Sequence, residues 1–350
     1  MKFGLFGGAT SHGSNVAIDS GQDYRRYIDY ICEAERLGFH SVFMVEHHFT
    51  GFNQVSASLT FLAYLAARTS KIRLGTGVTV LPWHNPALLA EQAATVDMLS
   101  NGRLDFGVGR GYRYAEFSGF CIPMSEAQER YDEALDVIRK AWTSSGRFSH
   151  HGKHWHYDNV VIEPAPTQSP HPPFWVGAGN LDVIRTVARE GIKVLLDQLS
   201  VPEVCGQRLA AYREAVEGQG RVFNPLDVGL TRGLHIAMNA AERDHQHALR
   251  AQFLDHVRRL TVNPNAAAGT LAMAATGSSP REATEKTTLI GTPDEIIGRL
   301  KVLEAQGIEY VLLMDLEGSL DSLRTFAREV MPEFSGTARE TRAETQLAAA

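Results

Sequence analysis

The 350-residue sequence has few cysteines, no excess of positive charge and no long apolar run. Its three cysteines, Cys32, Cys121 and Cys205, are far apart and form no C-x-x-C pair, so neither a disulfide framework nor a thiolate zinc site is expected. A formal net charge of −6 provides no basic face for nucleic acid or an anionic membrane. No run is long enough to span a bilayer and the N-terminus lacks a signal-peptide layout, so we expect a cytoplasmic protein.

Sequence motifs of several enzyme classes are also missing, including the G-x-S-x-G elbow of hydrolases, the P-loop and the H-E-x-x-H zinc motif. Residues 107–112 resemble the G-x-G-x-x-G dinucleotide motif, but Tyr112 occupies the third glycine position and no acid follows at the expected spacing. Four histidines gather between residues 150 and 156, but no acid or thiolate completes a ligand set at zinc spacing. Neither a dinucleotide fingerprint nor a metal site is therefore expected.

What the sequence does contain is a regular alternation of strand-like apolar runs and segments with helical periodicity. Eight strands are predicted, at residues 2–7, 41–45, 72–81, 104–108, 174–176, 193–196, 228–236 and 310–314. Eight strands separated by helices predict an α/β fold, a single (β/α)8 TIM barrel over residues 1–334. A doubly wound open sheet is the alternative, but it usually needs fewer units.

Two stretches interrupt this alternation. Residues 147–173 combine two alternating segments with a proline-rich run, which predicts a hairpin insertion after the fourth helix. Residues 263–288 are rich in Ala, Gly, Ser and Thr and too long for an ordinary connection, so they predict a mobile lid loop near the seventh strand and helix. Residues 335–350 are small and charged, and we expect them to form a flexible tail.

The residues most indicative of chemistry follow the second predicted strand, where the apolar run 41–45 leads directly into Glu46, His47 and His48. Loops at the carboxyl ends of parallel strands build the active sites of barrel enzymes. Adjacent residues of a strand point to opposite faces, so the two histidines are not expected to bind one ion. One would face the barrel mouth and the other would support it. A polar cap that merely ends the strand at the surface is the alternative.

An arginine and a glycine-rich turn near two other strand ends predict an anion site. Arg110 follows the fourth strand, and its planar guanidinium suits a phosphate, although a salt bridge at the barrel rim would also explain it. Backbone N–H groups between a strand and a helix would form the other side of a phosphate cradle, although glycine is also ordinary in such turns. The residues of this turn are Gly177, Ala178, Gly179 and Asn180. Gly75 and Gly77 within the third strand indicate the close approach of a ligand or tight packing.

Several motifs occur in a fixed order along the chain. They lie at residues 2–4, 46–50 (E-H-H-F-T), 74–82, 100–111, 291–293 and 330–332. As a set, they resemble the bacterial luciferase-like, flavin-dependent monooxygenases, a family of (β/α)8 barrels. The resemblance covers nearly the whole chain.

The resemblance implies a monooxygenase that uses reduced FMN and O₂ to oxygenate a small or medium organic substrate through a flavin C4a-(hydro)peroxide. A separate NAD(P)H:flavin reductase would supply the reduced FMN, since the chain has no NAD(P)H fingerprint. It also implies a homodimer. Two alternatives stay open: a deazaflavin (F420)-dependent dehydrogenase of the same superfamily, and a non-catalytic partner subunit. Glu46-His47-His48 argues against the second of these.

The resemblance also implies roles for individual residues. His47 matches the catalytic histidine, with Glu46 and His48 in support, and Arg110 and Arg130 would bind the flavin phosphate. The remaining implied cofactor contacts are Gly75, Thr76, Gly77, Val78, Gly111, Tyr112, Gly177, Ala178, Gly179 and Asn180. Among them, the Gly77–Val78 bond falls where the family has a non-prolyl cis peptide beneath the flavin ring, and residues 263–288 would form the lid.

Two departures from the luciferase pattern affect these roles. Gly109 replaces a reactive cysteine, and Ala178 and Gly179 replace an acid and a hydroxyl at the phosphate site. Four aromatic side chains at or near strand ends indicate an apolar or aromatic pocket, which would suit an organic substrate or the flavin itself. These are Phe6, Phe49, Trp83 and Tyr112.

Overall fold

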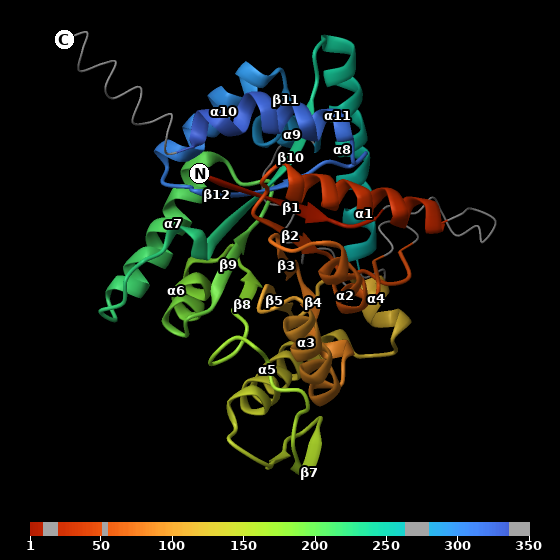
Figure 1. The fold of residues 1–350 in the computed structure, drawn as a ribbon, viewed down its shortest axis with the longest axis vertical. Helices are drawn as coiled ribbons and strands as arrows, with labels where there is room; N and C mark the ends of the chain where they lie inside the picture. The colour runs from red at the N-terminus through yellow and green to blue at the C-terminus, as the bar shows by residue number, and fades with distance from the viewer. Residues whose placement is uncertain (10–19, 51–54, 263–279, 336–350) are drawn as a thin grey trace.

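The computed structural model describes residues 1–9, 20–50, 55–262 and 280–335, and its centre is a closed barrel of eight parallel strands (Figure 1). The strands are β1 (Lys2–Gly7), β2 (Ser41–Met44), β3 (Arg73–Thr76), β5 (Leu104–Gly109), β8 (Phe174–Gly177), β9 (Lys193–Leu196), β10 (Val228–Ile236) and β12 (Tyr310–Met314). They pair in this order around the barrel, and β10 closes it by pairing with both β9 and β12. The predicted TIM barrel is confirmed.

Two short strands supplement the barrel. The third predicted strand, 72–81, is divided into β3 and β4 (Thr79–Val80), and the peptide bond Gly77–Val78 between them is cis, as the resemblance implied. Strand β4 pairs with β5, and β11 (Leu289–Gly291) pairs with the C-terminal residues of β10. Because every barrel pairing is parallel, all eight carboxyl ends open at one mouth.

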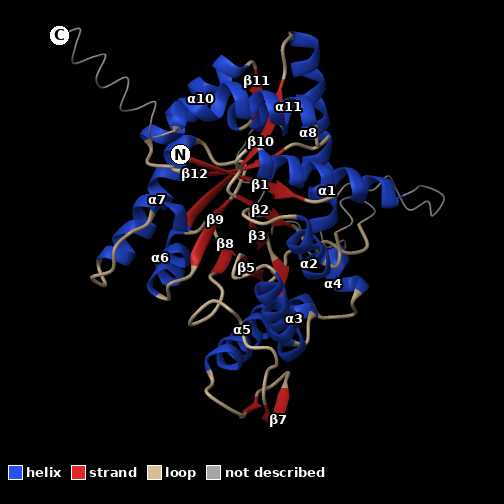
Figure 2. Cartoon of the chain, viewed as in Figure 1, coloured by secondary structure: helices blue, strands red, loops and turns tan. Residues whose placement is uncertain are grey.

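Helices surround the barrel, as the colouring by secondary structure shows (Figure 2). They include α1 (Ser20–Arg36), α2 (Ser58–Arg68), α3 (Pro86–Leu99), α5 (Ala127–Thr143), α6 (Leu181–Arg189), α7 (Pro202–Glu217), α8 (Ala240–Thr261), α10 (Pro293–Ala305) and α11 (Leu320–Thr325). Helix α10 begins where the sequence predicts: Thr292 and Glu295 form a reciprocal capping box, with Pro293 at the first helical position. None of the described helices is both long and apolar enough to cross a membrane.

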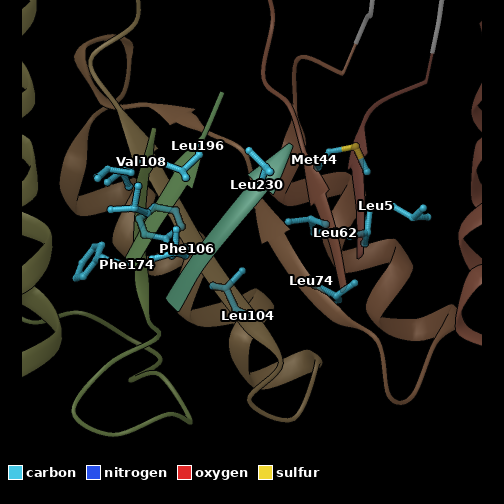
Figure 3. Packing of buried hydrophobic residues seen from close by; sticks show 14 of the residues in the cluster. Leu5, Met44, Leu62, Leu74, Leu104, Phe106, Val108, Phe174, Leu196 and Leu230 are labelled. Carbon is cyan, nitrogen blue, oxygen red and sulfur yellow. The ribbon is translucent and has the colours of Figure 1, made fainter. Parts of the chain in front are cut away.

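The largest hydrophobic cluster lies between the barrel wall and these helices. Leu104, Phe106 and Val108 alternate along β5 and are fully buried in it, and Figure 3 shows them with Phe174 and Leu196 of neighbouring strands. Fully burying one such side chain contributes about 1.5–3 kcal/mol, so this layer is a major source of stability. A smaller cluster fills the barrel interior and contains Phe43, Trp175, Leu195, Tyr310 and Leu312.

The two interruptions predicted from sequence have different structures. Within 147–173, strands β6 (Phe148–His151) and β7 (His156–Val160) form an antiparallel pair. Within the loop predicted over 263–288, residues 263–279 lie outside the described residues, and Pro280–Thr287 form helix α9. The loop prediction was wrong for α9, because Arg281 pairs one turn along with Glu285 and also with Asp244 of α8. The predicted tail lies outside the described residues from 336 onward.

Candidate active site

The acidic and imidazole side chains predicted to end the second strand lie just beyond it. Strand β2 ends at Met44, so Glu46, His47 and His48 belong to the following loop. The strand alternation used to separate the two histidines therefore does not apply to them. Both imidazoles are 15% exposed, and each has a different carboxylate partner.

His47 is held by a residue that the sequence did not single out. Its Nδ1 lies 3.0 Å from Glu116 Oε1, and the backbone N–H of His48 donates to the same oxygen, also at 3.0 Å. Glu116 is fully buried and comes from α4 (Tyr114–Gly119), a short helix that follows β5 and was not predicted. A carboxylate at Nδ1 fixes the proton there, so the other ring nitrogen, Nε2, carries the lone pair.

The surroundings of His47 lower its pKa. Burial makes the largest contribution, and the positive charge of Arg113 acts in the same direction. The hydrogen bond and charge of Glu116 oppose them without reversing the sign. His47 is therefore a neutral imidazole at neutral pH, the form that accepts a proton.

Glu46 has other partners than the one the resemblance implied. Its Oε1 accepts from His48 Nε2 at 2.9 Å and from His84 Nε2 at 2.6 Å, and its Oε2 accepts from the backbone N–H of Val80 at 3.0 Å. Burial acts to raise the pKa of Glu46, but the hydrogen bonds from His48 and His84 outweigh it and hold that pKa below its usual range. Glu46 is thus an anion that ties the β2 loop to β4, and Glu116 supports His47 in its place.

Aromatic rings surround His48. Its ring centroid lies 4.8 Å from that of Phe120, 5.4 Å from that of Trp83 and 5.8 Å from that of Phe49. Phe49 has a left-handed backbone (φ 59°) and is 65% exposed, so it lies at the rim. Two of the four predicted pocket aromatics, Phe49 and Trp83, therefore belong to one cluster beside the second histidine.

Two buried polar atoms next to this network have no hydrogen-bond partner within the described parts of the chain. They are Trp83 Nε1, whose indole packs on His48, and Arg113 Nε, whose guanidinium lies 4.0 Å from Glu116 Oε1. Buried donors in proteins are normally satisfied, so these two point to a bound molecule with acceptor atoms. An isoalloxazine ring has such atoms, and the site fits a flavin in this respect.

The residues predicted to lie beneath the flavin pack closely inside the barrel. A Cβ at Gly75 would lie 2.6 Å from the ring of Phe43, and one at Gly77 would lie 2.7 Å from the ring of Phe6. These contacts are tight packing against aromatic side chains of the barrel itself, and the approach of a ligand stays a prediction. Thr76 Oγ1 donates to the carbonyl of Gly107 at 2.6 Å. Val78 packs on the interior cluster, as does Phe6.

The predicted arginine side of the phosphate cradle lies at the end of β5. Arg110 is exposed and donates to Gln128 of α5 at 3.2 Å, while Arg130 donates to Glu126 at 2.8 Å and lies over the Trp155 ring. Neither cation is buried, so both are accessible to an anion. Gly111 and Tyr112 follow in the same loop, with Tyr112 46% exposed beneath the guanidinium of Arg113.

The glycine side of the cradle lies next to it, because β8 pairs with β5. Gly177 and Ala178 end the strand, and the Asn180 side chain caps α6 by accepting from the backbone N–H groups of Asp182 and Val183. A Cβ at Gly179 would lie 3.0 Å from Arg208 Nη2, an arginine that sequence reasoning missed. Arg208 also binds Asp197, at 2.6 Å.

Two histidines of the hairpin attach it to helix α5. His150 pairs with Glu133 and His154 with Glu129, both carboxylates of α5. Glu133 also accepts from three backbone N–H groups of the hairpin turn, at residues 153–155. No group of His, Cys, Asp and Glu among the described residues could hold a metal ion.

Sequence reasoning therefore found the loop that carries the histidines but missed most of their partners. Glu116, Arg113 and His84 belong to no motif, and only the fold brings them to β2. One signal was present: Glu116 follows Arg110 within a few residues, in the loop after a barrel strand where site residues concentrate.

Comparisons with known proteins show the family and the fold of the chain. The family model for luciferase-like monooxygenases matches residues 1–310. The oxygenase component of flavin-dependent trigonelline monooxygenase from Acinetobacter baylyi is 30% identical over 354 residues, covering 96% of each chain. The FMNH2-dependent dimethylsulfone monooxygenase of Pseudomonas putida is 27% identical over 364 residues, covering 93% of this chain and 92% of that one. The crystal structure of monooxygenase RslO1 from Streptomyces bottropensis matches with a TM-score of 0.79 at 27% identity, covering 96% of this chain and 100% of that chain.

Proposed function

The chain belongs to the luciferase-like monooxygenase family, and we propose that it is the FMN-dependent oxygenase component of a two-component system. It is an oxidoreductase, and its relatives are flavin-dependent monooxygenases. The finer proposal is that reduced FMN comes from a separate reductase and that O₂ oxygenates a small or medium organic substrate. A relative that uses FMNH2 and a relative that is an oxygenase component support these two points.

The observation that carries the proposal is the pairing of His47 with Glu116. A buried carboxylate holds the Nδ1 proton, and burial keeps the ring neutral, so Nε2 is a base of fixed orientation. We assign His47 as the residue that accepts and returns a proton at Nε2 during the reaction. Glu116 positions it, and Glu46 holds the loop beside it through His48 and His84.

The cofactor would lie beside this network. Trp83 Nε1 and Arg113 Nε are the unsatisfied donors available to it, and Arg110, with Arg130 and the turn at Gly179, is available to its phosphate. Reduced flavin, when bound, supplies the electrons for O₂ chemistry, which the protein residues cannot supply. The rings of Trp83 and Phe120 pack on His48 and would shield this side of a bound cofactor from water.

Anaerobic binding of reduced FMN followed by rapid mixing with O₂ tests the proposal. We expect the protein to bind reduced FMN and to slow the return of oxidised-flavin absorbance relative to free reduced FMN, because the site excludes water. Identical reoxidation with and without protein would contradict the proposal. The same measurement with reduced F420 tests the dehydrogenase alternative, which predicts binding of F420 and no reaction with O₂.

Two further experiments concern partners. The protein with NADH, NADPH and FMN is expected to oxidise neither nicotinamide until a flavin reductase is added, and oxidation by the protein alone would remove the need for a partner. We also propose a homodimer. Exposed apolar side chains on neighbouring helices α2 and α3 support it, and light scattering of the purified protein tests it. These side chains are Tyr64, Leu88, Met98 and Leu99.

A further inference from the structure

A buried arginine, Arg250, lies near the carboxyl ends of β10 and β12. Phe253, Leu254 and Val257 of α8 form an apolar cluster there with Met314, at the end of β12. Phe6 packs on this cluster and also on the cluster of the barrel interior. The inner face of α8 therefore borders the same mouth as the predicted flavin contacts at Gly77, over which Phe6 lies.

Arg250 projects from this apolar face of α8. It precedes Phe253 and Leu254 by three and four residues, so all three lie on one side of the helix. The residue is only 2% exposed. Its Nη1 donates to the carbonyl of Met314 at 3.2 Å, and its Nη2 donates to Gln198 Oε1 and lies 3.6 Å from Met314 Sδ.

All of these partners are neutral. No carboxylate among the described residues lies within ion-pair distance of Arg250, although burial lowers its pKa only to about 10, so it remains charged at neutral pH. Asp315 is the carboxylate whose charge acts on it, but this residue pairs with His235 at 3.5 Å. Arg232, also fully buried, adds a second positive charge nearby. A buried charge whose nearest carboxylate lies beyond ion-pair distance is only partly compensated, and a ligand of opposite charge would complete its compensation.

The guanidinium of Arg250 packs against a position of β10 that has no side chain. Gly233 of β10 lies against it, and a Cβ at this position would overlap the guanidinium carbon. The Gln198 side chain belongs to the loop after β9 and is only partly buried, so it can move away. Its amide oxygen occupies the position that an anionic oxygen would take with a stronger, charge-assisted hydrogen bond.

We propose that Arg250 binds the anionic group of the substrate in exchange for Gln198, and that the substrates are organic anions with an apolar body. This inference rests on the proposed function only in that it places a substrate at the same mouth. The apolar body would contact the cluster of Phe253, Leu254 and Met314, and the charged group would end at Arg250. Another source of an anion is the phosphate of FMN, and the experiment below distinguishes the two.

The test is calorimetric titration of the FMN-bound protein with two matched pairs, benzoate against benzamide and octanoate against octanamide. We expect each anion to bind at least about tenfold more tightly than its amide, because only the anion supplies the missing counter-charge. The preference should disappear in Arg250→Met and persist in part in Arg250→Lys. The exposed control Arg328→Met should retain it in full. Equal binding of anions and amides by the wild type would overturn the proposal.

The melting temperature of Arg250→Met distinguishes a role of Arg250 in substrate binding from a purely structural role. Replacing a buried charge that has only neutral hydrogen-bond partners with an apolar side chain of similar size removes the desolvation cost of that charge, so Arg250→Met should melt at or above the wild-type temperature. A lower melting temperature with the anion preference intact would assign Arg250 to structure alone and overturn the proposal.

A comparison of FMN with riboflavin completes the test. Arg250→Met should leave the ratio of their affinities unchanged, and loss of the preference for FMN would assign Arg250 to the flavin phosphate instead. All of these are equilibrium measurements, so their outcome does not depend on whether reduced FMN reacts with O₂. Failure of the proposed function would appear only in the O₂-mixing experiment.

Discussion

Buried charged side chains at the barrel mouth have different kinds of partner near β2 and near β10. In the loops after β2 and β5, Glu46 and Glu116 hold three imidazoles at distances between 2.6 and 3.0 Å. At the ends of β10 and β12, Arg250 is buried as deeply but meets only neutral oxygen and sulfur atoms. The two carboxylates of the first region are paired with imidazoles, whereas Arg250 in the second has no carboxylate partner among the described residues and is left for a ligand.

This difference separates two tasks that an oxygenase must perform. A base needs a fixed tautomer and a pKa matched to its proton transfer, and paired carboxylates and imidazoles provide both. A binding group needs an interaction that is completed only when the ligand arrives, and an internal salt bridge at Arg250 would have removed that gain. The four predictions below test whether the two regions are separate, in decreasing order of expected effect.

The largest effect is expected for His47→Ala. Loss of the base should reduce the rate of product formation by about 10²–10⁴-fold while binding of reduced FMN changes little. Product formed with isotopically labelled O₂ and an accepted substrate provides the measurement. His151→Ala, in the exposed hairpin, is the control and should match the wild type. Unchanged turnover in His47→Ala would show that this assignment is wrong and would favour His48.

The second largest effect is expected for Glu46→Gln, which should lower the stability of the protein. A glutamine cannot accept from Val80 on one side and from His48 and His84 on the other, so one buried donor loses its acceptor. We expect a loss of about 2–4 kcal/mol in the free energy of unfolding, measured with urea. The pKa of Glu46 is lowered, so its contribution is fully present above 4.5, its ordinary pKa, and is lost as pH falls through the lowered value. The difference between the two proteins should therefore narrow in acid, and a constant difference would contradict an ionised Glu46.

Gly233→Ala tests the Arg250 side. The added methyl group overlaps the guanidinium, and we expect a loss of about 1–3 kcal/mol in the free energy of unfolding. In an Arg250→Met background the loss should be smaller, so a double-mutant cycle should show a coupling between the two positions. Gly298→Ala in α10, where a Cβ meets open space, is the control and should stabilise the protein by about 0.5–1 kcal/mol. Strict additivity of the pair would mean that Arg250 is easily displaced from Gly233.

The smallest effect is expected in the pH dependence of activity, which should shift in opposite directions in Glu116→Gln and Arg113→Met. Glu116 acts to raise the pKa of His47 and Arg113 acts to lower it. Since activity requires neutral His47, the acid limb should move to lower pH in Glu116→Gln and to higher pH in Arg113→Met. Rates measured across the acid range give both shifts. Shifts of the same sign would indicate that the limb belongs to another group, and Arg250→Met should not move it at all.

The sequence predicted the barrel well because each strand and helix has its own local pattern. The boundaries of β1, β9, β10 and β12 agree with prediction to the residue, because each strand is mostly apolar, although β10 also buries Thr231, Arg232 and His235. The third strand was predicted too long, because apolar composition continues through Gly77–Val78, where the pairing changes. Helix α9 was missed since its surface is polar and its partners lie on α8.

The site was predictable only in part, for a related reason. Glu46, His47 and His48 are adjacent in sequence, and their position after a strand was enough to find them. Their partners Glu116 and His84 come from other loops, and an isolated acid or histidine has many ordinary explanations. Arg250 was missed because a basic residue within a polar helix is typical of a solvent-exposed position. Its burial depends on how α8 packs over the mouth.

The placement of Arg250 on α8 also bears on how easily such an enzyme can be retargeted. The imidazoles and carboxylates come from the segments after β2, β4 and β5, whereas Arg250, Phe253 and Leu254 come from consecutive turns of one helix. A library confined to that helix can alter which molecules are accepted and leave the proton-transfer residues untouched. Residues that select the substrate and residues that transfer the proton are thus on different elements, so natural divergence or laboratory evolution can change the first set and leave the second unchanged.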